Sequence, residues 1–167
     1  MSVPALFLPL LSLLFYQAVS AAPKVPDSPF VALTVYDGNW KVTPAATAGT
    51  PAKVDRLVNH CTMGDAFYTC EQVVNGKPVA LVVFVADGKP GSYHTRIVLP
   101  DGQAAGGSQL TIAGPQWTFL STDKAGKPSF RVVNVFTGRD RIHSEQFQAA
   151  ADGSWTKVGE QTTVRAD

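Results

Sequence analysis

From residue 35 to residue 165, short runs of β-branched and aromatic residues alternate with turn dipeptides that contain glycine. Each run has the length of a β-strand, and no window of about ten residues repeats its apolar positions with the period of an amphipathic helix. The predicted strands are, in chain order, 35–42, 53–60, 66–74, 78–86, 92–100, 108–114, 116–122, 129–136, 141–149 and 154–165. Strands that follow one another through tight turns are expected to pair antiparallel with their sequence neighbours.

Six dipeptides that end in glycine mark the expected turns, because glycine adopts positive φ without steric strain. They are Asn75-Gly76, Asp87-Gly88, Asp101-Gly102, Ala125-Gly126, Thr137-Gly138 and Asp152-Gly153. An open sheet of this size would expose two long edges, and closing the sheet removes both. The sequence therefore predicts an all-β fold, an antiparallel up-and-down barrel of about eight to ten strands. A β-sandwich is the alternative.

Alternation within a strand tells which side chains share a face, but it does not tell which face points inward. In the predicted strand 92–100, for example, Tyr93 and Thr95 share one face, and His94 and Arg96 share the other. Any assignment of interior residues from the sequence alone therefore rests on an assumption about which face points inward.

The first 21 residues carry no charged side chain and include an apolar run, Leu6 to Phe15. A run of about ten residues suits the hydrophobic region of a signal peptide and is short for a membrane-spanning helix. Val19 and Ala21 are the small residues expected before a cleavage site. The predicted organisation is a signal peptide at 1–21, an extended proline-rich leader at 22–32 and a β-barrel domain at 33–167.

The alternative for the N-terminal segment is a buried helix, which Pro4 and Pro9 would interrupt. Beyond residue 21 the sequence offers no further candidate for a membrane span. We therefore predict an exported protein, periplasmic or secreted, with no membrane span after signal cleavage.

The charges are balanced, with 14 Lys and Arg against 13 Asp and Glu. No stretch concentrates basic residues, so the sequence predicts neither a nucleic-acid partner nor binding to anionic lipid. The length of the chain suits one domain with one core. We expect a monomer.

The chain has two cysteines, Cys61 and Cys70. Redox motifs use the spacing C-x-x-C, and structural zinc sites need further ligands at close spacing, so neither reading fits this pair. An even number of cysteines in an exported chain is typical of a disulfide. We predict a structural disulfide between Cys61 and Cys70 across a turn at residues 63–65, with a reactive pair as the alternative.

The stretch YDGNWKV, residues 36–42, contains Gly38-Asn39-Trp40. It resembles the Gly-x-Trp motif that opens the first strand of lipocalins and related calycin barrels. The resemblance implies that Trp40 closes one end of the barrel and that a basic residue of the last strand, Arg165, packs over it. The pattern NHC, CEQVVNGK, LPDG, GPQWTF and DGSW is also similar to small exported bacterial proteins of unknown function with calycin-like barrels.

The same resemblance implies that a small apolar or amphipathic molecule binds inside the barrel. Polar groups set among aromatic side chains would orient such a ligand. On the assumption that their strand faces share one interior, the candidate ligand-binding residues are Tyr93, Arg96, Trp117, Arg131, Asn134 and Glu145. A cell-envelope interaction module with a filled barrel is the alternative function.

An enzyme is the third possibility, and the sequence names no catalytic residue for it. The histidines, His60, His94 and His143, show no spacing that places two metal ligands together. Some related barrels bind haem through one histidine, for which His143 would be the candidate here, although an ordinary hydrogen-bonded histidine is the simpler reading. We predict no metal site and no cofactor.

Overall fold

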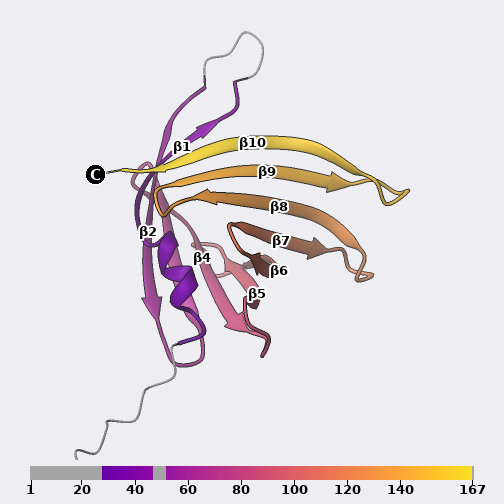
Figure 1. Ribbon diagram of the computed structural model, residues 1–167, viewed down its shortest axis with the longest axis horizontal. Coiled ribbons are helices and arrows are strands. Elements are labelled where there is room, and N and C mark those ends of the chain that lie inside the picture. Colours follow the sequence, from indigo (N-terminus) through magenta and orange to yellow (C-terminus); the bar gives the residue numbers. More distant parts are fainter. Residues whose placement is uncertain (1–27, 47–51, 167) are drawn as a thin grey trace, which may run out of the picture.

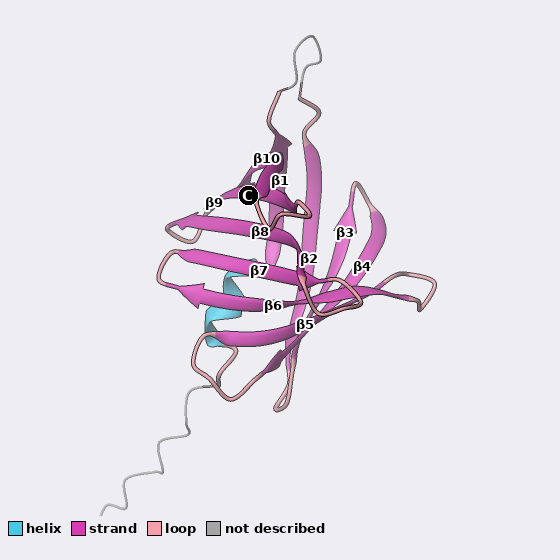
Figure 2. Ribbon diagram, turned by 90° about the vertical axis from the view of Figure 1, so that its right-hand side faces the viewer, coloured by secondary structure: helices cyan, strands magenta, loops and turns pink. Residues whose placement is uncertain are grey.

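The computed structural model describes residues 28–46 and 52–166, which form a closed antiparallel β-barrel (Figures 1 and 2). One 3₁₀ helix precedes ten strands. The elements are η1 (Val31–Tyr36), β1 (Gly38–Pro44), β2 (Asp55–Met63), β3 (Tyr68–Val74), β4 (Lys77–Ala86), β5 (Ser92–Val98), β6 (Ala104–Ala113), β7 (Gln116–Thr122), β8 (Pro128–Thr137), β9 (Arg141–Ala149) and β10 (Trp155–Arg165). Each strand pairs with its sequence neighbours, and β1 pairs with β10. The predicted all-β barrel is confirmed.

Tight turns determine this up-and-down order. The glycine of each of the six predicted turn dipeptides has positive φ. Between β3 and β4, Asn75 (φ 50°) and Gly76 (φ 81°) both lie in the left-handed region, as a type I′ hairpin requires. The twist of such a turn matches the twist of the strands that it joins, so each strand folds back on the one before it.

Helix η1 occupies one end of the barrel interior (cyan in Figure 2). Leu33 is fully buried and Val35 is 5% exposed. Phe30, directly before the helix, is 1% exposed. These side chains form the main core cluster with inward-facing residues of five strands, which are Tyr68, Cys70, Phe84, Tyr93, Leu110 and Trp117.

The structure corrects the predicted start of the domain. Residues 29–32 were expected in an exposed leader, but they form a turn and the first residues of η1, and Phe30 belongs to the core. The first strand begins at Gly38 rather than at residue 35. A helix of six residues is too short to show a helical period, which explains why the pattern missed it.

The predicted signal peptide, 1–21, and residues 22–27 of the predicted leader lie outside the described residues. Within the described ranges, no helix has both the length and the apolar character that crossing a membrane requires.

Cys61 and Cys70 form the predicted disulfide, with a Cα–Cα distance of 4.1 Å. They are directly opposite each other in the β2–β3 hairpin. Cys70 belongs to the buried core, and Cys61 packs against that core. The bond therefore joins two neighbouring strands at the end of the barrel that holds η1.

We expect Leu33→Ala to lower the free energy of unfolding by about 2–5 kcal/mol, because it leaves a cavity where a fully buried side chain packed. Val31→Ala is the matched control in the same helix. Val31 is 52% exposed, so its change should stay within about 0.5 kcal/mol. Urea unfolding followed by tryptophan fluorescence measures both values. Equal stability of the two variants would show that η1 is not part of the cooperative core.

The double variant Cys61→Ala/Cys70→Ala should lose about 2–3 kcal/mol of stability, the amount expected for opening a cross-link between residues nine positions apart. The same urea titration, run on the variant and on the reduced parent, measures the loss. If reduction left the urea midpoint of the parent unchanged, the bond would not contribute to stability.

Candidate functional site

The barrel interior beyond η1 holds a cavity of about 300 Å³. A second compartment of about 200 Å³ shares seven lining residues with it, so the two compartments lie next to each other in the interior. The apolar walls come from six side chains, Leu57, Ile97, Phe119, Phe130, Val132 and Ile142. Hydroxyl and amide groups lie among them, from Gln72, Ser108, Ser121, Ser144, Gln161 and Thr163.

None of the described residues that line this cavity carries a charge. The polar lining consists of amides, hydroxyls and the indole of Trp40. An ion that left water for such a space would lose its hydration without gaining an opposite charge. The cavity therefore suits an uncharged molecule.

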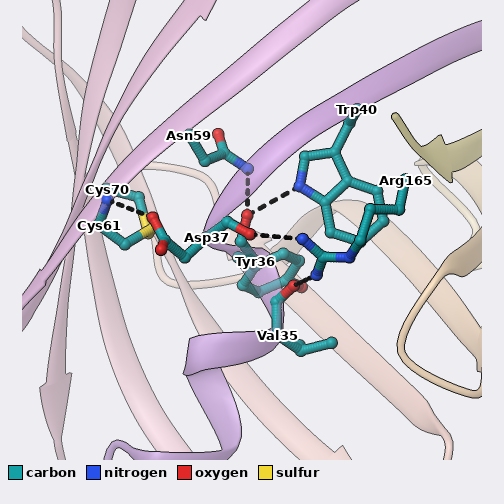
Figure 3. The surroundings of a disulfide bond; sticks show 8 residues. All are labelled: Val35, Tyr36, Asp37, Trp40, Asn59, Cys61, Cys70 and Arg165. Carbon is teal, nitrogen blue, oxygen red and sulfur yellow. Dashed lines mark hydrogen bonds between the residues drawn. A yellow bond between two sulfur atoms is a disulfide. The ribbon is translucent and has the colours of Figure 1, made fainter. Parts of the chain in front are cut away.

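The floor of the cavity is built around Tyr36, the last residue of η1. Its carbonyl oxygen accepts hydrogen bonds from Trp40 Nε1 and from Asn59 Nδ2, each at 2.9 Å (Figure 3). Its hydroxyl accepts a bond from Asn134 Nδ2 at 3.3 Å. Burial raises the pKa of Tyr36 far above its ordinary value, so the phenol stays neutral.

Arg165 holds the junction between η1 and β1 from the last strand. Its guanidinium lies 4.2 Å from the ring centre of Trp40 (Figure 3). It donates from Nη1 to the carbonyl of Asp37 and from Nη2 to that of Val35, both at 2.8 Å. A side chain at Gly38, where φ is 106°, would place its Cβ 2.9 Å from Arg165 Nη1. The positive φ favours glycine at position 38, and any larger residue there would also displace the guanidinium of Arg165.

Three of the six residues predicted to bind a ligand face the interior. Asn134 lines the cavity. Trp117 lies behind the floor, with its ring perpendicular to that of Tyr36 and the two ring centres 5.3 Å apart. Tyr93 lies beside η1, where its hydroxyl donates to the carbonyl of Pro29 at 2.5 Å. Of the three, only Asn134 is in contact with the empty space.

The other three lie on the outer surface of the barrel. Arg96 is exposed on β5. Arg131 lies 4.5 Å from the ring centre of Phe147 and 4.6 Å from that of Trp155. Glu145 accepts a hydrogen bond from Lys157 at 2.6 Å. The six residues therefore do not form one site, and the assumption that their faces share an interior is not met.

Most of the residues that line the cavity are not predicted from the sequence, above all Tyr36, Asn59 and Gln72. Isolated amide and hydroxyl side chains belong to no recognisable motif. Strand alternation also does not tell which face of a strand points inward. One signal was available: Asn59 lies two residues from Cys61 and therefore shares its face of β2.

No histidine lines the cavity among the described residues. His60 and His94 are exposed, and His143 lies on the outer face, 3.4 Å from Glu160 Oε1. The described residues contain no cluster of three or more His, Cys, Asp or Glu side chains that could hold a metal ion. An interior haem held by His143 does not fit this arrangement.

The sequence matches no protein-family model and no curated protein. The fold is similar to that in the crystal structure of Rv2717c from M. tuberculosis, with a TM-score of 0.52 and 14% sequence identity. The similarity covers 86% of this chain and 99% of that chain. At this level of identity it supports the barrel architecture alone.

Arg165→Lys should lower the free energy of unfolding by about 1–3 kcal/mol, since a lysine ammonium cannot stack on Trp40 and reach two separate carbonyls at once. Arg141→Lys is the control, because Arg141 is exposed on the neighbouring strand. Thermal unfolding of both variants, with tryptophan fluorescence as the readout, measures the difference. Equal losses in the two variants would contradict the role given to Arg165.

Proposed function

We propose that this protein binds a small, uncharged, partly apolar molecule inside its barrel. The observation that carries the proposal is the cavity itself: an interior space of about 300 Å³ with apolar walls, scattered amide and hydroxyl groups and no charged lining among the described residues. Pockets for small ligands combine mostly apolar walls with a few polar groups that fix orientation. A volume at the lower end of their usual range favours a compact ligand.

The cavity extends away from η1, toward the end of the barrel where β7 ends and β8 begins. Ser121 and Phe130, which pair across these strands, belong to its lining. The opposite end is occupied by η1 and its aromatic neighbours. We infer that a ligand enters from the end that η1 does not occupy. The alternative of an interaction module with a filled barrel would require side chains in this space.

The proposal includes export to an oxidising compartment. The Cys61–Cys70 disulfide supports it, since such bonds persist outside the reducing cytosol. Under this proposal the mature protein is a periplasmic or secreted carrier or sensor of its ligand.

A bulky side chain in the cavity should block binding. We expect Ser121→Trp to weaken binding of the neutral fluorescent probe N-phenyl-1-naphthylamine at least about tenfold, because an indole there occupies the space. Thr122→Trp is the matched control, since Thr122 follows directly in β7, is exposed and does not line the cavity. Titration of the probe, followed by its own emission, gives both affinities.

Equal affinity of the parent and both variants would show that the probe binds outside the barrel. If the parent itself fails to bind the probe, or any of a set of neutral aromatic compounds of similar or smaller size, the proposed function is wrong.

A further inference from the structure

One polar atom at the floor of the cavity has no partner. Asn59 is 4% exposed and lines both compartments of the cavity. Its Oδ1 is buried and has no hydrogen-bond partner among the described residues. Leaving a buried acceptor unpaired is unfavourable, and such an atom in a native fold calls for an explanation.

Rotating the side-chain amide of Asn59 would not give Oδ1 a hydrogen-bond partner without losing another hydrogen bond. Asn59 Nδ2 donates to the carbonyl of Tyr36 at 2.9 Å, and that oxygen also accepts from Trp40 Nε1 (Figure 3). Exchange of Nδ2 and Oδ1 would bring two acceptor oxygens together and lose a hydrogen bond. The contact with Tyr36 therefore holds Oδ1 on the side away from that carbonyl.

Few neighbouring side chains could donate a hydrogen bond to Asn59 Oδ1. Asn59 lies on β2, and its partners across the sheet are Gly38 of β1, which has no side chain, and Gln72 of β3. Gln72 also lines the cavity, but it does not donate to Asn59. Asn59 itself lines both compartments, so the cavity borders its side chain.

We propose that Asn59 Oδ1 is the specificity group of the cavity and accepts a hydrogen bond from an N–H or O–H group at the buried end of the ligand. This inference rests on the proposed function and narrows the ligand class. The ligand is a compact, uncharged, mostly apolar molecule with a donor at one end, such as an indole, a phenol or a secondary amide. An ether, ester or hydrocarbon of equal size would leave the acceptor unpaired.

Indole and benzofuran provide a matched pair of probes, because they have nearly the same shape and differ in an N–H donor against a ring oxygen. We expect the parent protein to bind indole about tenfold more tightly than benzofuran, the ratio that one hydrogen bond of ordinary net strength provides. Benzofuran is the more apolar of the two, so burial alone would give the opposite order. Isothermal titration calorimetry gives both affinities.

Asn59→Leu should reduce this ratio to about one or below while it keeps the binding of benzofuran. His60→Leu is the control, since the next residue of β2 is exposed and faces outward, and it should keep the ratio of the parent. If the preference for indole disappears in Asn59→Leu and is kept in His60→Leu, the result supports Asn59 Oδ1 as the acceptor. Retention of the ratio in Asn59→Leu would overturn this assignment and place the donor contact elsewhere in the cavity.

The affinities of the parent protein for indole and benzofuran test the role of Asn59 even if Asn59→Leu does not fold. Equal binding of indole and benzofuran by the parent overturns the role of Asn59 and leaves the proposed ligand cavity intact. If the parent binds N-phenyl-1-naphthylamine but neither indole nor benzofuran at millimolar concentration, this inference alone is overturned. If it binds none of the three, the proposed function is overturned as well.

Discussion

The architecture depends on the burial of η1 in one end of the barrel. Leu33 and Val35 place apolar side chains among residues of β3 to β7, so strands that are not paired with each other share one core. Arg165 then fixes the end of the helix from the last strand, through the carbonyls of Val35 and Asp37 and the ring of Trp40. Helix burial and barrel closure are therefore coupled at one junction.

This junction also determines where the cavity begins. The helix ends at Tyr36, whose carbonyl orients Trp40 and Asn59 and whose ring packs against Trp117. Leu33 and Val35 of η1 pack in the core, and Tyr36 itself lines the cavity. The contacts that stabilise the fold thus also orient the polar groups at the floor of the proposed binding site.

Local signals in the sequence were sufficient to predict the barrel, but not to predict which residues line its interior. Turn glycines and runs of β-branched residues predicted the strand order, and the disulfide followed from two cysteines that flank a turn. The inward faces could not be predicted, because a period of two defines two faces and only the closed register of the sheet selects one. Arg131 and Glu145 have side chains suited to binding a ligand, but both lie on the outer surface of the barrel. Asn59 had no motif to mark it.

We propose that the interior of this barrel holds a small neutral molecule next to Tyr36. The most direct measurement is a crystal structure of the protein grown with N-phenyl-1-naphthylamine. We expect electron density for the probe within the barrel, between Phe119 and Ile142 and next to the floor formed by Tyr36 and Asn59. An interior closed by repacked side chains, with the probe on the outer surface or absent, would contradict it.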